Sequence, residues 1–177
     1  MGGTTRICVI SDTHMPRRAH TLPAACRARL ARADLVIHAG DHSDAASLAA
    51  LRAIGPPVVA VHGNVDGEDL RRALPATAGV EAAGLRIAVV HDAGPAAGRL
   101  ARMRRRFPDA GLVVFGHSHI PLVERAPDGF AILNPGSPTD RRRHPHHTMA
   151  EVEVAPGAAP RIAIVTLDGP GDPHAPG

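Results

Sequence analysis

The chain has 177 residues, a net charge of +3 with histidine neutral, 2% aromatic residues and two cysteines. This length predicts one domain with an aliphatic core at 1–168, followed by a flexible Gly- and Pro-rich tail at 169–177. The cysteines form no CxxC pair, which excludes a disulfide framework and predicts two buried free thiols. Without a signal peptide or an apolar run of membrane-spanning length, we expect a cytoplasmic protein with no membrane partner.

Apolar runs alternate with helical patterns through the first two thirds of the chain. The apolar runs predict strands at 7–10, 35–38, 58–61, 85–90 and 112–115. The segments between them predict helices at 23–33, 44–54, 68–74 and 95–107. Continuous apolar strands separated by helices are typical of a sheet that is buried on both faces.

The pattern changes after residue 115. Four further strands are predicted with turns and no helix between them, at 122–125, 130–133, 149–154 and 161–167. A run of hairpins of this kind indicates an antiparallel section. The sum is a mixed α/β domain, in which two sheets pack face to face with helices outside.

Polar side chains follow each of the first five predicted strands. The five stretches are Ser11-Asp12-Thr13-His14, Gly40-Asp41-His42, Gly63-Asn64-Val65-Asp66, His91-Asp92 and Gly116-His117-Ser118-His119. Ligands of open α/β sheets bind beyond the carboxyl ends of the strands, so we expect these side chains to meet at one edge. Two carboxylates, one amide and four imidazoles suit first-row cations, and seven donors are enough for two ions.

The spacing within these stretches also suggests how the donors point. Asp12 and His14 are two residues apart, so an extended strand end would turn both to the same side, and His117 and His119 would repeat that geometry. Each stretch alone is equally typical of a turn, a strand cap or a packed histidine. Their joint occurrence favours a metal site, because Asp12 and Asp41 would repel each other without a cation.

The order Asp-x-His, Gly-Asp, Gly-Asn-x-Asp, His, Gly-His-x-His resembles the calcineurin-like metallophosphoesterase superfamily, and in particular its small bacterial and archaeal phosphodiesterases. Ser11-Asp12-Thr13-His14 and Asn134-Pro135-Gly136-Ser137-Pro138 resemble signatures of that subgroup. The resemblance covers nearly the whole chain. It implies an α/β fold, specifically a four-layer α/β/β/α sandwich with two mixed β-sheets.

The resemblance also implies two divalent metal ions, with manganese expected first and Ni, Fe, Co or Zn as alternatives. The implied ligands are Asp12, His14 and His119 for the first ion, Asn64, His91 and His117 for the second, and Asp41 as a bridge between them. A metal-bridging hydroxide would attack phosphorus without a protein nucleophile. The implied substrate is a small phosphodiester, which Asn64 would face.

One position departs from the family pattern. Many members carry a histidine directly after the asparagine of the third stretch, where it contacts substrate, and this chain has Val65 there. The change leaves the metal ligands intact. Valine, however, cannot protonate a poor leaving group as a histidine could. We also expect Asp66 to orient a histidine behind the ligands, either His38 or His62.

Several other functions fit less well. Gly116-His117-Ser118-His119 lacks the second glycine of a serine nucleophile elbow, and no Gly-rich dinucleotide fingerprint follows the first strand. Few aromatic residues are available for base stacking, so nucleic acid is expected only as a substrate end. The complete ligand set favours an enzyme over a non-catalytic binding scaffold of the same fold; a phosphomonoesterase is the other alternative.

Two questions stay open from the sequence. The oligomeric state is one, and a homo-oligomer is compatible with the composition. The other is the basic loop at 141–147, which is either a solvated surface loop or a rim that guides anionic substrate.

Overall fold

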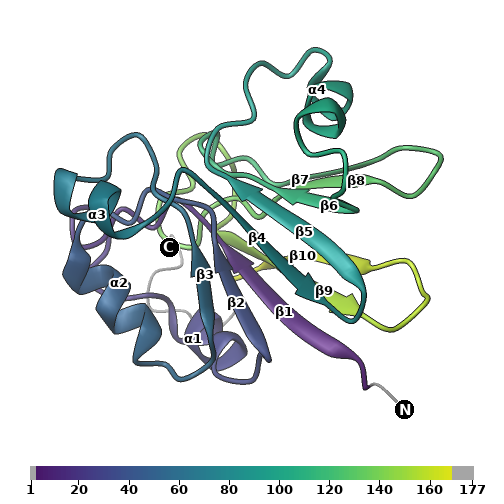
Figure 1. The fold of residues 1–177 in the computed structure, drawn as a ribbon. Helices are drawn as coiled ribbons and strands as arrows, with labels where there is room; N and C mark the ends of the chain where they lie inside the picture. Colours follow the sequence, from purple (N-terminus) through teal and green to yellow (C-terminus); the bar gives the residue numbers. More distant parts are fainter. Residues whose placement is uncertain (1–2, 169–177) are drawn as a thin grey trace.

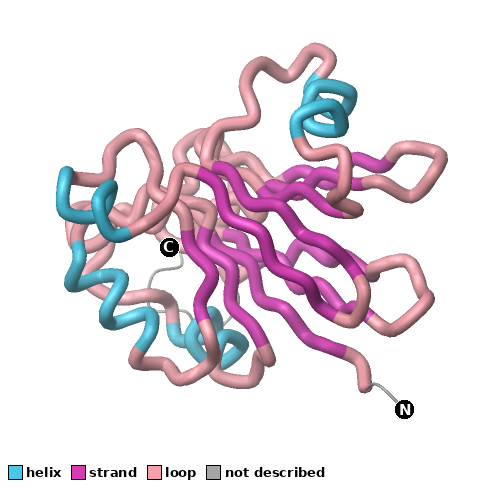
Figure 2. Tube along the Cα trace, in the orientation of Figure 1, coloured by secondary structure: helices cyan, strands magenta, loops and turns pink. Residues whose placement is uncertain are grey.

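Two five-stranded sheets lie at the centre of the molecule, with helices on the outside (Figures 1 and 2). The computed structural model describes residues 3–168, so the predicted tail lies outside the described residues. The first sheet has the strand order β10 (Arg161–Thr166), β9 (Thr148–Val154), β1 (Thr5–Ile10), β2 (Leu35–His38), β3 (Val58–Ala60). The second has the order β4 (Thr77–Ala82), β5 (Leu85–Val90), β6 (Leu112–Val114), β8 (Ala131–Asn134), β7 (Leu122–Arg125).

Both sheets are mixed, which confirms the predicted fold class. Strands β1, β2 and β3 are parallel, and β9 is antiparallel to β1. In the second sheet β5, β6 and β8 are parallel, while β4 and β7 run antiparallel at the two edges. The strands after residue 115 do form two hairpins, but these are divided between the sheets and β8 pairs parallel with β6.

Side chains along β1 alternate between two apolar layers. Ile7 and Val9 pack between the sheets against residues of the second sheet. Cys8 and Ile10 face the opposite layer, which α1 (Ala24–Leu30) and α2 (Ala45–Arg52) cover. Alternation of this kind is the period-2 geometry of a strand, and here both faces are buried.

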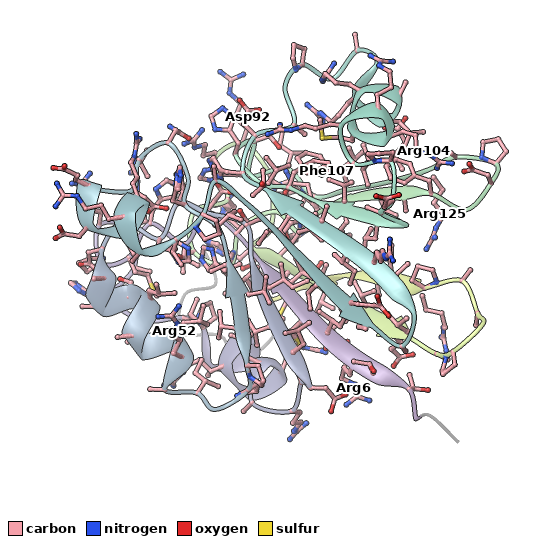
Figure 3. The ribbon with its side chains drawn as sticks, in the orientation of Figure 1. Arg6, Arg52, Asp92, Arg104, Phe107 and Arg125 are labelled. Carbon is pink, nitrogen blue, oxygen red and sulfur yellow. The ribbon has the colours of Figure 1, made fainter. Side chains whose placement is uncertain are left out.

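The remaining helices close the outer layers. Leu70 of α3 (Glu68–Ala73) packs with α2 on the first sheet, and Met103 of α4 (Arg99–Arg106) packs on the second. Charged side chains such as Arg52 and Arg125 are exposed on the outside (Figure 3). Within residues 3–168 no helix has the length and apolarity needed to cross a bilayer.

The helices are shorter than the sequence predicts. The prediction at 95–107 is wrong at its start, because Gly98 adopts a left-handed conformation with φ of 67° and the helix begins only at Arg99. The guanidinium of Arg102 holds the preceding segment in a loop, donating to the carbonyl oxygens of Ala93 at 2.7 Å and Ala97 at 3.2 Å. These hydrogen bonds replace the helical ones that the pattern suggested.

The sequence prediction missed β4 altogether. Its residues are mostly small, only Ala82 is buried, and Gly79 lies near its centre, so no strong alternation of apolar side chains marks it. The strand forms because Ala83 and Gly84, with φ of 48° and 86°, make a two-residue turn that pairs it with β5. Positive φ at both positions is the geometry that matches the twist of a tight hairpin.

Candidate metal centre

Asp12, His14 and His119 form one compact group of buried donors. Asp12 and His14 follow β1, and His119 follows β6 in the other sheet. The Nε2 atoms of His14 and His119 are 3.2 Å apart, and Nε2 of His119 lies 3.4 Å from Oδ1 of Asp12. Side chains from strand ends of both sheets therefore meet in this group, as predicted.

The backbone that presents Asp12 and His14 differs from the prediction. An extended strand end was expected, but β1 stops at Ile10, and Asp12 and His14 have φ of 56° and 46°. The loop is fixed because the Asp12 and His14 N–H groups donate to the carbonyl oxygens of Gly40 and Asp41, at 2.9 and 3.0 Å. Left-handed backbone at non-glycine residues is strained and is concentrated at functional sites.

Asp41, His91 and His117 form a second group of donors. Asn64 joins it, since its Oδ1 lies 2.9 Å from Nε2 of His91 and 3.0 Å from Nδ1 of His117. His117 and Asn64 are the exposed members. The expectation that His117 and His119 point to the same side from an extended strand end is wrong, because both residues are left-handed, with φ of 69° and 60°, and they turn to different groups.

Asp41 lies between the two groups. Its Oδ2 is 3.3 Å from Nε2 of His91 in the second group and 3.7 Å from Nε2 of His14 in the first. Its Oδ1 accepts a hydrogen bond of 3.0 Å from the N–H of Val65. One carboxylate is thus placed within reach of donors from both groups.

Hydrogen bonds to backbone carbonyls fix the orientation of two imidazoles. Nδ1 of His91 donates to the carbonyl oxygen of Ala39 at 2.7 Å, and Nδ1 of His119 donates to that of Asp140. The Nε2 atoms of both rings therefore face the oxygens and nitrogens of the centre, where a bound cation would take the place of the proton between His91 and Asp41. Imidazole, carboxylate and amide donors arranged in this way fit first-row divalent cations.

Burial and neighbouring charges shift the pKa values of Asp12, His91 and His119. Burial raises the pKa of Asp12 to about 7, against the opposing charge of His91. Burial alone would lower the pKa of His91, but its hydrogen bond with Asp41 and the charge of Asp12 raise it to about 9. Burial lowers the pKa of His119 to about 4, so at neutral pH its Nε2 keeps a lone pair for a ligand.

Asp66 does not orient a histidine, contrary to the prediction. Its carboxylate accepts from three backbone N–H groups, those of Asp41 at 3.0 Å, Ser43 at 2.8 Å and Gly63 at 2.7 Å. Buried Asp66 thereby ties the loop after β2 to the loop after β3, and it places Asp41 through its backbone.

His38 and His62 also have roles other than the one expected. Nδ1 of His38 accepts from the N–H of Gly40 at 3.2 Å, which leaves its Nε2 to donate to Oγ1 of Thr13 at 3.0 Å. His38 therefore connects the loop after β1 to the loop after β2. His62 is half-buried and its ring contacts only the Gly63 carbonyl oxygen, at 3.4 Å, among the polar groups described.

The segment Asn134–Pro138 had no predicted role. It supports two of the ligand-bearing loops, the one after β1 and the one after β6. Buried Asn134 donates from Nδ2 to the carbonyl oxygen of Gly116 at 2.8 Å. Ser137 Oγ donates to the carbonyl oxygen of Asp12 at 2.8 Å and accepts from the N–H of Asp140 at 2.8 Å. In the sequence, the only sign of this role is that small polar residues follow a predicted strand. Their hydrogen-bond partners, Gly116 and Asp12, cannot be read from that pattern.

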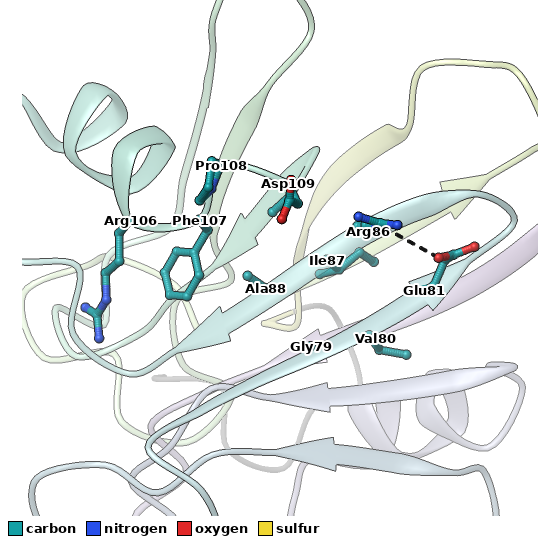
Figure 4. Close-up of a pocket in the computed structure, with 11 residues that line it drawn as sticks. Gly79, Val80, Glu81, Arg86, Ile87, Ala88, Arg106, Phe107, Pro108 and Asp109 are labelled. Atoms are coloured by element: carbon teal, nitrogen blue, oxygen red, sulfur yellow. Dashed lines mark ion pairs between the residues drawn. The ribbon is translucent and has the colours of Figure 1, made fainter.

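A cavity of about 490 Å³ lies elsewhere, between β4, the first half of β5 and residues 106–110 (Figure 4). It is at the end of β5 opposite to His91. Arg86 in its wall pairs with Glu81 at 3.7 Å, and Arg106 lies over the ring of Phe107 at 5.2 Å. Both cations already have partners, and no group of metal donors lines this cavity, so the candidate site is at the other end.

Comparisons with known proteins agree with this centre. The family model of the calcineurin-like phosphoesterase superfamily domain matches residues 5–157. A probable metallophosphoesterase of Methanocaldococcus jannaschii is 37% identical over 142 residues, which are 78% of this chain and 71% of that protein.

Solved structures share the fold. Vps29 of Chaetomium thermophilum has a TM-score of 0.75 at 21% identity, covering 91% of this chain and 96% of that one. Vps29 of Entamoeba histolytica complexed with Zn²⁺ has a TM-score of 0.73 at 22% identity, covering 92% and 99%. From the sequence matches and the placement of its donors, this chain belongs to the calcineurin-like phosphoesterase superfamily.

Proposed function

We propose that the protein is a dinuclear metal-dependent phosphodiesterase that acts on a small phosphodiester. The observation that carries the proposal is the position of Asp41, whose Oδ2 lies 3.3 Å from His91 and 3.7 Å from His14. A carboxylate shared by two groups of donors is suited to hold two cations close together.

The ligand assignment follows the two groups. Asp12, His14 and His119 would hold the first ion, Asn64, His91 and His117 the second, and Asp41 would bridge them. Manganese is the expected metal, and Ni, Fe, Co and Zn suit the same donors.

Two bound cations would lower the pKa of a water and polarise the phosphoryl oxygens, so that no protein nucleophile is needed. The protein's own residues provide the geometry. The hydrogen bonds of His91 and His119 to Ala39 and Asp140 aim their Nε2 atoms inward, and exposed Asn64 and His117 leave the second group open to substrate.

Val65 limits the range of substrates. Its side chain is 38% exposed beside Asn64 and has no proton to donate, so a leaving group receives none from this position. Diesters with acidic leaving groups are therefore the preferred substrates of this proposal. A phosphomonoesterase is the alternative, and a panel of diesters and monoesters tested with each metal distinguishes the two.

A non-catalytic scaffold is the alternative of a different class. The likeness to Vps29 is a likeness of fold, and the complete set of seven donors in this chain favours an enzyme. A purified protein that binds metal and hydrolyses no phosphoester would support the scaffold. We also propose a reducing, cytoplasmic compartment, because Cys8 and Cys26 are free and buried.

The test is hydrolysis of bis(p-nitrophenyl) phosphate by the Mn²⁺-loaded protein and by Asp41→Asn. Because Asp41 serves both groups, we expect the variant to lose at least about 100-fold in kcat/KM. Asp92→Asn is the matched control, since Asp92 is exposed and its Oδ1 only accepts from the N–H of Gly94 at 2.7 Å.

Chelation completes the test. A strong chelator should abolish hydrolysis, and Mn²⁺ should restore it. Activity that persists in the chelator, or an Asp41→Asn variant as active as Asp92→Asn, would contradict the proposal.

A further inference from the structure

The basic loop at 141–147 begins at the first group of donors. Nδ1 of His119 donates to the carbonyl oxygen of Asp140, and the Asp140 carboxylate lies 3.8 Å from the same ring. Ser137, which contacts the backbone of Asp12, holds the N–H of Asp140 at 2.8 Å. Arg142 is two residues further on, so its Cα is within about 8 Å of the Asp140 Cα.

Several cationic groups near Arg142 are already engaged, unlike its exposed neighbour Arg143. Arg18 pairs with Asp140 at 3.5 Å, and the Arg141 guanidinium donates to the carbonyl oxygen of His144 at 3.1 Å. His147 pairs with Asp168 at 2.7 Å. Arg142, in contrast, is exposed and has no ion-pair partner within residues 3–168.

Arg142 is also held in an unusual backbone conformation. Its φ is 46°, in the left-handed region that residues with a Cβ rarely adopt. A residue kept in such a conformation is over-determined by its surroundings, and these cases concentrate at ligand-binding positions.

Arg142 also lies close to the first group, because Asp140, two residues before it, contacts the ring of His119 with its carbonyl oxygen and its carboxylate. A guanidinium in this place repels a cation bound by His119. Such an arrangement is stable when an anion lies between the two positive charges, and a guanidinium fork matches phosphate oxygens.

We propose that Arg142 binds the non-bridging oxygens of the phosphate group held at the metal centre, so that the basic loop is a substrate-binding rim and not merely a solvated surface. This inference rests on the proposed function for its metal ions. Arg142 would contact the substrate without being a metal ligand. The ligand of the basic loop would be a phosphate anion.

The experiment measures binding of inorganic phosphate to the Mn²⁺-loaded protein by calorimetry. We expect Arg142→Ala to weaken phosphate binding by about 10-fold or more, since a charge-assisted hydrogen bond is lost. The affinity for Mn²⁺ should be unchanged or higher, because a repelling charge is removed. Arg142→Lys should restore part of the phosphate affinity, as it keeps the charge without the fork.

Arg143→Ala is the matched control, because Arg143 is the exposed neighbour and its removal changes the net charge equally. Equal losses in the two alanine variants would indicate long-range attraction and overturn the contact. Unchanged phosphate affinity in Arg142→Ala, or a parallel loss of Mn²⁺ affinity, would also overturn it.

The outcomes separate this inference from the proposed function. If phosphate binding follows the expected pattern but no phosphoester is hydrolysed, the enzyme assignment fails and the anion-binding role of Arg142 stands. If hydrolysis occurs with an unchanged KM in Arg142→Ala and unchanged phosphate affinity, the enzyme assignment stands and the role of Arg142 fails.

Discussion

At Gly63 the backbone passes so close to Asp41 that a side chain has no space. A Cβ there would lie 2.0 Å from Oδ1 of Asp41 and 2.5 Å from its backbone nitrogen. The reason is steric, since Gly63 has no positive φ, and the close approach is what lets its N–H donate to Asp66 at 2.7 Å.

Gly63→Ala should therefore displace the Asp41 carboxylate and weaken Mn²⁺ binding by at least about 10-fold, as expected when a ligand loses its support. Gly67→Ala is the control from the same loop, because nothing lies within 4 Å of a Cβ at Gly67. Calorimetric titration of both variants with Mn²⁺ checks this. Equal affinities would show that the loop adapts to the methyl group.

Single residues of the centre were predictable from the sequence because each stands at a strand end. All seven predicted donors fall in the two groups or, for Asn64, in contact with one of them. The conformation of the residues was not predictable. Whether Asp12 is extended or left-handed depends on hydrogen bonds with Gly40 and His117, which lie far from it in the chain.

At the scale of elements, the segment from Asn134 to Asp140 is the support of the first group. Ser137 is buried, and its hydroxyl links the carbonyl oxygen of Asp12 to the N–H groups of Thr139 and Asp140. Asp140 in turn orients His119. One hydroxyl thereby connects two ligands of the same group through their backbones.

Ser137→Ala should destabilise the fold by about 1–3 kcal/mol, because it leaves buried polar groups without a partner. It should also weaken binding of one of the two ions more than the other. Thr148→Val is the control, since Thr148 is equally buried and its hydroxyl donates to the Pro135 carbonyl oxygen at 2.8 Å, not to Asp12 or Asp140.

For both variants, we would measure the metal stoichiometry, the metal affinity and the free energy of unfolding. If both variants lose stability equally and neither changes the stoichiometry or relative affinity of the two ions, Ser137 has a structural role only.

Elements with strong patterns were predicted well, and weak ones were not. Strands β2, β5 and β7 have the predicted bounds. Strand β4 was missed because its stability comes from pairing with β5, and the first turn of α4 was overpredicted because the Arg102 hydrogen bonds lie outside any local pattern.

At the scale of the whole molecule, the buried layer between the first sheet and its helices encloses both cysteines. Burial raises the pKa of the Cys8 thiol to about 11, with a further contribution from the charge of Glu151, and burial also raises the pKa of Cys26. The thiolate is the reactive form, so neither thiol is activated at pH 8.

We therefore expect no reaction of the native protein with Ellman's reagent at pH 8, and reaction of two thiols after unfolding in guanidinium. The time course of absorbance at the two conditions checks this expectation. Rapid reaction of the native protein would show that the helical layer opens readily.

The types of donor and the edge of the fold at which they lie could be predicted from the amino-acid sequence. Strand ends are local features, and the donor types beside them, Asp, Asn and His, are fixed by the sequence. The alternation of apolar runs and helices likewise determined the α/β class with two sheets.

Which donors lie together became clear from the three-dimensional arrangement of the two sheets. The first sheet supplies Asp12 and Asp41, and the second supplies His91, His117 and His119, so both groups exist only because strand ends of the two packed sheets meet. His14 and His119 are 105 residues apart, and no local pattern encodes their 3.2 Å approach. Packing between the sheets, and the buried hydrogen bonds of Asp66 and Ser137, set that distance.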